Sequence, residues 1–484
     1  MTSTYFTFGL YFVALLGLGI LAWQRTQDLS DYILGGRRLG SGVTALSAGA
    51  SDMSGWLLLG LPGAAYLGGL EAGWIALGLL IGTWLNWLVV SHRLRVATES
   101  LDNSLTLPDY FERRFADTSG VLRIIPGIFI FVFFALYVSA GLVAGGRLFE
   151  TVFEMPYMWA VTAGATAIII YTFLGGYLAV SWTDALQALL MLLALVAVPL
   201  MAIGFGDTGL VDSMRESNPH LLNPFTGADG QALGVLAIVS LMAWGLGYFG
   251  QPHILARFMG IRSATQLTRA RRIAVSWATI CLVAAIFVGM AGIGGLTEVL
   301  DGPDAETVFI RLVEVLFHPV IAGICLAAIL AAVMSTADSQ LLVASSVVAE
   351  DFYKGLIRPN AKQSELVWIG RFSVIAIALV AMWLAADPDR MVLDLVAHAW
   401  AGLGAAFGPV IVMSLYWPAM SRAGAAAGMV AGGLTVLIWQ PLEGGLFDVY
   451  EILPGAILAA LFAVGFSRLM PDERARQRYA TMLD

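Results

Sequence analysis

The segment ASDMSGW, residues 50–56, places a carboxylate, two hydroxyls and a glycine inside an apolar run. A helix interrupted at such a point leaves carbonyl oxygens without partners, and these oxygens can bind a hard monovalent cation. The candidate oxygens are the carbonyls of Ala50 and Met53, with Asp52, Ser54 and Gly55 beside them. Asp52 could bind the cation directly, support the site from behind, or cap the second half of the helix. An aspartate in mid-membrane costs about 2.5–3.5 kcal/mol and usually marks an ion or solute pathway.

The segment LAAVMSTADSQ, residues 330–340, offers oxygens that could face the first set. Its hydroxyls are those of Ser335, Thr336 and Ser339, and the carbonyl of Ala332 joins them if these side chains perturb the helix. Three carbonyls and two hydroxyls form a neutral set that suits sodium better than calcium or magnesium. From spacing alone, bonding of Ser335 and Thr336 to the preceding turn is the simpler interpretation.

Two further acids and four aromatic residues stand out in apolar stretches. Asp184, in SWTDALQ, lies where a cation leaving inward could pause, although an acid at a helix N-terminus is an equally good interpretation. Asp338, one turn beyond Ser335, is either a relay or a residue that faces polar neighbours. Aromatic side chains near the interruptions could enclose a small amphipathic solute, and they are Trp56, Tyr137, Trp244 and Tyr248.

The elements that carry these residues are membrane spans. The 484 residues are 59% hydrophobic and only 12% charged, against about 25% charged in soluble domains. Nothing in the sequence favours nucleic-acid binding or an enzyme, since no metalloprotease, Walker or nucleophile-elbow motif stands in a supporting context. A span needs about 20 helical residues, and this length predicts an all-α protein with thirteen spans, at 5–24, 41–66, 72–92, 122–148, 156–174, 183–204, 233–252, 273–298, 318–349, 367–387, 394–417, 423–440 and 451–470.

The basic residues predict the orientation of these spans. With the N-terminus outside and the C-terminus in the cytoplasm, all but four of the 26 basic residues lie in cytoplasmic segments. The exceptions are Arg147, Arg215, Arg311 and Arg390. Such a split follows the positive-inside rule and predicts a multi-pass protein of a cytoplasmic membrane.

Two spans are interrupted near their middle. The second contains SAGASDMSGW and GLPG, and the seventh reads LMAWGLGYFGQPH, with Gly245, Gly247, Gly250 and Pro252 close together. Because the interruptions are five spans apart, an odd number, the same unit would enter the membrane from opposite sides, as in transporters with inverted repeats. We therefore expect an N-terminal helix and loop at 1–40, repeats at 41–204 and 233–417, and spans 12 and 13 with a short tail at 423–484.

Four segments resemble those of the sodium/solute symporter family. They read ASDMSGWLLLGLPGAAYLGGLEAGWIALG, FLGGYLAVSWTDALQ, GYFGQPHILARFMG and AAVMSTADSQLLVASS. The resemblance implies a ten-helix core of two inverted repeats and import driven by sodium, with L-proline as the expected solute, in the inner membrane of a bacterium. Onto matching positions it places a sodium site of Ala50, Met53, Ala332, Ser335 and Thr336. It also implies an essential Asp52 and a solute pocket near Ser54, Gly55, Trp56, Tyr137, Trp244 and Tyr248.

Several alternatives stay open from the sequence. The transporter could carry another small amino or carboxylic acid, or use protons with Asp52 as the titrating group. A membrane sensor of this fold would be expected to append a signalling domain, which the short stretch after residue 470 does not suggest. A passive channel fits interrupted helices and an aromatic enclosure less well. Lipid is the expected surrounding, and no obligate protein partner is implied.

Overall fold

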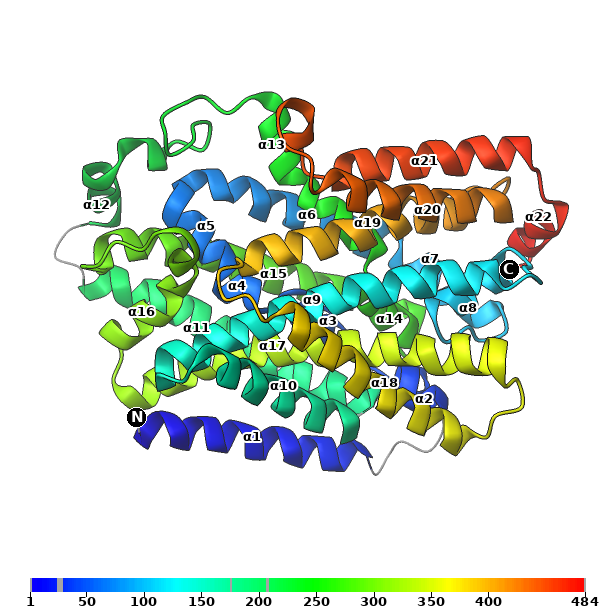
Figure 1. Cartoon of the computed structure of the whole chain (residues 1–484), viewed down its shortest axis with the longest axis horizontal. Coiled ribbons are helices and arrows are strands. Elements are labelled where there is room, and N and C mark those ends of the chain that lie inside the picture. The colour runs from blue at the N-terminus through cyan, green and yellow to red at the C-terminus, as the bar shows by residue number, and fades with distance from the viewer. Residues whose placement is uncertain (1, 24–28, 175, 206–208, 483–484) are drawn as a thin grey trace.

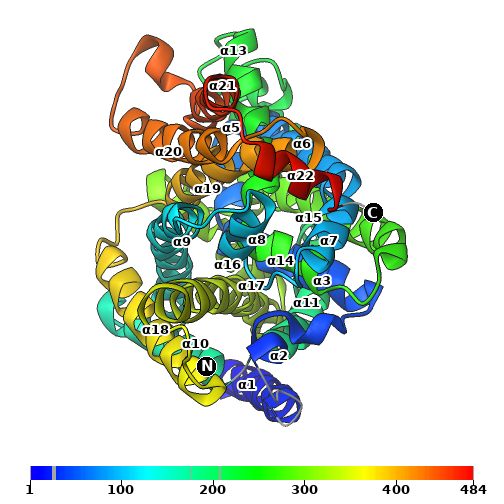
Figure 2. The same ribbon diagram turned by 90° about the vertical axis from the view of Figure 1, so that its right-hand side faces the viewer.

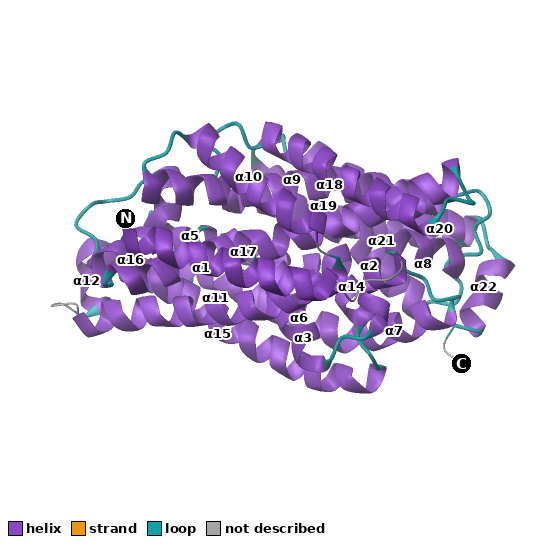
Figure 3. Cartoon of the chain, turned by 90° about the horizontal axis from the view of Figure 1, so that it is seen from below, coloured by secondary structure: helices purple, strands orange, loops and turns teal. Residues whose placement is uncertain are grey.

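The structure, a computed structural model, describes residues 2–23, 29–174, 176–205 and 209–482. Helices make up nearly all of this part of the chain, and its β pairing consists of two isolated bridges. Most helices run along the long axis, with α1 (Thr2–Trp23) starting near one end and α22 (Glu473–Ala480) lying at the other (Figure 1). Loops gather mainly toward the two ends (Figure 3). Apolar helices satisfy their own backbone groups, which lipid requires.

Each predicted span overlaps a helix of the structure. The uninterrupted long helices are α1, α6 (Gly73–Val89), α9 (Val121–Phe153), α10 (Tyr157–Leu174), α11 (Tyr177–Phe205), α15 (Leu267–Gly295), α17 (Pro319–Ser346), α18 (Gln363–Leu384), α19 (Val392–Tyr416), α20 (Arg422–Trp439) and α21 (Ile452–Leu469). By length and apolar composition, nine helices among the described residues can cross a membrane, or ten if one bent pair is a single span. Two shorter apolar helices, Phe6–Leu21 and Tyr157–Phe173, fall below that length. The count of thirteen crossings therefore stays a prediction.

Short helices fill the connections. They are α2 (Leu29–Leu34), η1 (Gly35–Arg37), η2 (Gly69–Ala72), α7 (Ser91–Ser100), α8 (Leu107–Arg114), α12 (Leu210–Ser217), η3 (Pro219–Leu222), η5 (Ala264–Gln266), η6 (Gly302–Thr307), α16 (Val308–Leu316), η7 (Val347–Ile357), η8 (Gly445–Asp448) and α22. α17 and α19 are the most enclosed of the long helices. Seen along the long axis, α9 and α17 lie inside the bundle, α1 and α18 at one edge, and α20 and α21 at the opposite edge (Figure 2).

The first interrupted span divides into α3 (Ser41–Asp52), α4 (Gly55–Leu58) and α5 (Gly60–Gly68). α3 stops because Met53 leaves the helical region, with φ −86° and ψ 81°, and Ser54 is extended. Gly55 is required by close packing, since a Cβ there would lie 2.7 Å from the Ala144 Cβ of α9. The predicted interruption is confirmed.

The second interrupted span divides into α13 (Val235–Met242), η4 (Ala243–Gly250) and α14 (Pro252–Gly260). The segment Val235–Gly250, formed by α13 and η4, meets α14 at a bend of 46°. Pro252 starts α14 at a position where its missing N–H costs nothing. Gly247 allows η4 to pack against α19, because a Cβ there would lie 1.8 Å from the Trp400 Nε1. This interruption is also confirmed, and α14 carries the span past its predicted end at residue 252.

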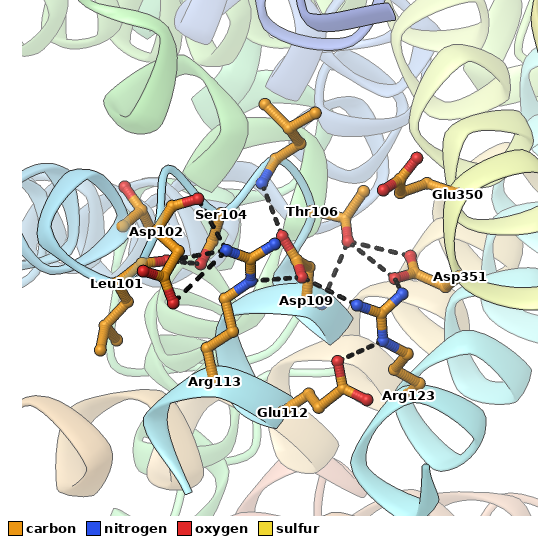
Figure 4. A network of polar contacts seen from close by, with 12 residues as sticks. Leu101, Asp102, Ser104, Thr106, Asp109, Glu112, Arg113, Arg123, Glu350 and Asp351 are labelled. Atoms are coloured by element: carbon orange, nitrogen blue, oxygen red, sulfur yellow. Dashed lines mark hydrogen bonds and ion pairs between the residues drawn. The ribbon is translucent and has the colours of Figure 1, made fainter. Parts of the chain in front are cut away.

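Ion pairs fasten the far end of α17, which continues as the π-helix η7. Arg123, at the start of α9, lies 3.0 Å from Asp109 of α8 and 3.5 Å from Asp351 of η7. The Thr106 hydroxyl donates to Asp351 at 2.9 Å, so three elements meet at this point (Figure 4). The network holds in place the helix that carries Ser335 and Thr336.

Candidate functional site

Four of the five predicted sodium-site residues, Ala50, Ala332, Ser335 and Thr336, are joined by hydrogen bonds where α3 ends against α17. The Ala50 carbonyl accepts a hydrogen bond from the Ser335 hydroxyl at 2.8 Å and from the Thr336 hydroxyl at 3.3 Å. Ser335 also donates to the Ala332 carbonyl at 3.1 Å. The Ala50 carbonyl is free for these contacts because the Ser54 N–H, which would continue the helix, donates to the Asp52 carbonyl instead.

The chemistry of these oxygens fits a monovalent cation. Ala50, Met53, Ala332, Ser335 and Thr336 are all buried, and their candidate ligand oxygens are uncharged. Met53 follows the last residue of α3, directly at the interruption. In the structure the hydroxyls donate toward carbonyls, and a bound cation would replace those hydrogen bonds with direct contacts to the same oxygens. No group of three or more His, Cys, Asp or Glu side chains suited to a metal ion occurs in the described part of the chain.

Asp52 links the two interrupted spans. The Tyr248 hydroxyl of η4 donates to Asp52 Oδ2, while Asp52 Oδ1 is buried without a hydrogen-bond partner among the described residues. Asp52 is the last residue of α3, and the residue at the N-cap of α4 is Ser54, whose side chain makes no capping bond. The capping interpretation of Asp52 is therefore wrong, and its two ion-related interpretations stay open.

The four predicted aromatic residues surround the interruptions. Trp56 Nε1 and the Tyr137 hydroxyl both donate to the Asp52 carbonyl, at 3.2 and 3.3 Å. The Trp56 and Trp244 rings lie 6.3 Å apart. Ser54 and Gly55 are buried in the same interruption. The structure thus brings together every residue expected in the solute pocket, and their contact with a solute stays a prediction.

Trp400 of α19 completes this group, although no motif in the sequence points to it. Its Nε1 donates to the Trp244 carbonyl at 2.7 Å. Its ring lies 5.0 Å from Tyr248, edge to face, and 6.5 Å from Tyr137. Trp400 lies in an uninterrupted helix, so the glycines around it in AWAGLG were the one local sign of close packing.

Asp184 lies in a separate, charged cluster. It is deep within α11, which begins at Tyr177 rather than at the predicted residue 183, so the interpretation as an N-terminal helix acid is wrong. Asp184 Oδ2 lies 3.0 Å from Arg257 Nη2 and accepts from the Ser47 hydroxyl at 2.6 Å. Arg257, expected in a cytoplasmic segment, lies in α14 and is fully buried. The structure therefore places Asp184 against a guanidinium.

Asp338 belongs to this charged cluster as well. Ser339 on the same turn donates to Asp338 Oδ1 at 3.4 Å and accepts from Arg257. Asp338 Oδ2 is buried without a hydrogen-bond partner among the described residues. Two carboxylates thus share one guanidinium, and Asp338 faces polar neighbours, which was one of its two expected roles.

The comparison with known families decides the class of protein. The family model described as "Sodium:solute symporter family" matches residues 32–432. The chain belongs to this family. It is therefore a membrane symporter and not an enzyme, and the expected family is confirmed.

Relatives of this family member are similar over nearly their whole lengths. The "Sodium/proline symporter" of Escherichia coli (strain K12) is 51% identical over 485 residues, which cover 98% of this chain and 95% of that protein. The "High-affinity proline transporter PutP" of Bacillus subtilis (strain 168) is 47% identical over 480 residues, with 96% and 98% covered.

The fold is shared with solved transporters. The outward-open, substrate-bound structure of a Na⁺-coupled sialic acid symporter superimposes with a TM-score of 0.80 at 16% identity, covering 97% of this chain and 98% of that one. MhsT in complex with L-phenylalanine gives a TM-score of 0.53 at 12% identity. These likenesses confirm the helical transporter fold, while the division into two inverted repeats stays a prediction.

Proposed function

We propose that this chain imports L-proline together with sodium by alternating access in the inner membrane of a bacterium, with its N-terminus outside. The observation that carries this proposal is the oxygen set between α3 and α17, where Ser335 and Thr336 meet the free Ala50 carbonyl. Relatives at about half identity that are named proline symporters support the choice of solute.

The same contacts suggest how the ion and the solute are coupled. Sodium at Ala50, Met53, Ala332, Ser335 and Thr336 would tie the end of α3 to α17. Asp52 adjoins that site and also holds Tyr248 of η4, so order at the ion site would extend to the aromatic pocket. Proline would then bind more tightly with sodium present, and by linkage sodium would bind more tightly with proline present.

Transport is completed when the ion site and the solute site release their contents into the cytoplasm. Movement of one bundle against the other opens both sites inward, and the low sodium concentration of the cytoplasm empties the ion site first. The membrane potential assists because one charge crossing 100 mV is worth about 2.3 kcal/mol. Each step moves bound species, and no covalent bond forms or breaks.

Uptake by the purified protein in liposomes tests this proposal. Labelled proline is offered with an inward sodium gradient, beside equal potassium and proton gradients. Uptake with sodium alone, lost in Ser335→Ala and Thr336→Ala, is the expected result. Uptake with the proton gradient alone would show that protons and not sodium drive transport, with Asp52 as the proton carrier. Failure with every gradient would reject proline and direct the same assay to other small amino and carboxylic acids.

A further inference from the structure

The Trp244 ring has two aromatic neighbours, and one of them comes from outside the predicted repeats. The first is Trp56, at 6.3 Å and tilted by 42°. The second is Tyr450, at 5.4 Å and nearly parallel, with an interplanar angle of 28°. Tyr450 lies in the connection between α20 and α21, just before α21 begins at Ile452.

Three contacts hold this connection against the interrupted span and α19. The Tyr450 N–H donates to the Ser240 hydroxyl of α13 at 2.7 Å, and the Tyr450 hydroxyl donates to the Ala397 carbonyl of α19 at 2.7 Å. Glu451 Oε1 lies 3.3 Å from His398 Nδ1. Tyr450 therefore bridges α13 and α19 at the position where it also stacks on Trp244.

A cavity lies directly beside these contacts. It has a volume of about 590 Å³, and its lining includes Leu136, Asp394 and His398. Leu136 precedes Tyr137 of the aromatic pocket, and His398 is the residue held by Glu451. His398 thus joins this cavity to the α20–α21 connection, and Leu136 joins it to the helix that carries Tyr137.

We propose that the α20–α21 connection forms the outer wall of the solute pocket and that Tyr450 is a positioning residue for Trp244. The proposal rests on the function proposed above, since it takes Trp244 as part of the pocket. Stacking on Tyr450 and contact with Trp56 hold the Trp244 ring in one orientation, so the pocket keeps one size. Loss of the Tyr450 ring would leave Trp244 free to turn outward, which would weaken proline binding and admit larger rings.

Three variants in proteoliposomes test the proposal. Tyr450→Leu removes the stacking and the hydroxyl, and the apparent KM for proline should rise about tenfold, since these contacts are each worth up to about a tenfold change. Tyr450→Phe keeps the stacking and should retain most of the affinity. Phe447→Leu is the matched control, because Phe447 lies in the same connection but packs on Trp439 at 4.8 Å, away from the pocket.

Size discrimination separates positioning from a merely structural role. The KM ratio of pipecolate, which has one more ring carbon, to proline should fall in Tyr450→Leu and stay unchanged in Tyr450→Phe and Phe447→Leu. This ratio does not depend on how much of each variant is folded. An unchanged ratio together with a lower maximal rate in Tyr450→Leu would overturn the proposal.

A chemical measurement covers the case in which Tyr450→Leu does not assemble. The two native cysteines, Cys281 and Cys325, are buried, so Tyr450→Cys would introduce the reactive thiol. Saturating proline with sodium should slow its alkylation by a water-soluble maleimide and leave that of Phe447→Cys unchanged. Equal alkylation rates of Tyr450→Cys with and without proline would reject the proposal that the α20–α21 connection forms the outer wall of the pocket. Absence of proline uptake by the wild-type protein would instead reject the proposed function.

Discussion

Asp52 and Asp184 are both carboxylates buried in apolar helices, but their partners differ. Asp52 accepts one hydrogen bond from the neutral Tyr248 hydroxyl and keeps its other oxygen without a partner among the described residues. Asp184 lies 3.0 Å from the Arg257 guanidinium and also accepts from Ser47. A buried charge is tolerated when an opposite charge is beside it. Asp184 has an opposite charge beside it, which it shares with Asp338, whereas we propose that the charge of Asp52 is balanced by an arriving cation.

The partners of the two carboxylates indicate which one takes part in transport. A charge that is balanced within the protein fastens helices, and Asp184 joins α3, α11 and α14 through Ser47 and Arg257. A carboxylate whose charge is balanced only when the cation is bound contributes directly to the affinity for that cation. We therefore propose ion coupling for Asp52 and structural support for Asp184, although both were candidates for ion coupling from the sequence.

The largest expected effect is that of Asp52→Asn on transport. Removing the one unbalanced charge beside the neutral oxygen set should lower sodium-driven proline uptake at least about a hundredfold, the scale of a lost buried charge contact of about 3 kcal/mol. Initial rates over a sodium series in proteoliposomes measure it. The melting temperature in detergent should stay the same or rise, because the variant no longer buries an unbalanced carboxylate.

For Arg257→Gln the main expected effect is a loss of stability. It leaves Asp184 buried without its counter-charge, and breaking such a pair by removing one partner costs about 3–5 kcal/mol. Thermal unfolding in detergent should show a large loss of stability, and the double variant with Asp184→Asn should recover most of it. Recovery would be absent if each residue acted through separate partners.

Asp338→Asn is the matched control within the charged cluster. Two carboxylates share the Arg257 guanidinium through Ser339 and Ser47, so removing one leaves a balanced pair. Stability should be unchanged or higher, and sodium-driven uptake should stay within about twofold of wild type. A hundredfold loss of uptake here would show that Asp338 is a relay and would break the division between the two regions.

The sequence predicted the interruptions because they depend on local chemistry, since Gly55 and Pro252 disfavour continuous helix. The oxygen set was implied by the family resemblance, because spacing alone favoured bonding of Ser335 and Thr336 to the preceding turn. The burial of Arg257 was not predicted because the span was measured to residue 252, while α14 continues to Gly260. Trp400 and Tyr450 act through tertiary contacts with a chain segment more than a hundred residues away, and no spacing within either segment shows such contacts.

A smaller effect is expected from Tyr248→Phe, which sharpens the role of Asp52. The variant keeps the ring against Trp400 and removes only the hydroxyl that donates to Asp52. A hydrogen bond to a charged group is worth about 1.5–3 kcal/mol, so Asp52 would lose orientation but keep its charge. The apparent KM for sodium should rise roughly tenfold, with the maximal rate nearly retained. An equal loss of maximal rate would instead place the hydroxyl in the transport step.

The smallest effect is expected from Asp117, a buried carboxylate outside the spans. Burial raises its pKa, but hydrogen bonds from the Leu122 and Ser119 N–H groups, the Ser119 hydroxyl and Arg422 outweigh burial and hold the pKa below its usual value. A lowered pKa in the folded state means that the ionised form stabilises the fold. This stability is fully present above the unfolded pKa of about 4 and is lost as the pH falls through the folded value.

Asp117→Asn should therefore leave uptake at neutral pH unchanged and lower the melting temperature slightly. The difference from wild type should shrink below about pH 4, because the wild-type carboxyl is then protonated as well. A constant difference across that range would mean that the hydrogen-bonding geometry of Asp117 matters and its charge does not, which would limit the argument from balanced charge to the carboxylates within the membrane.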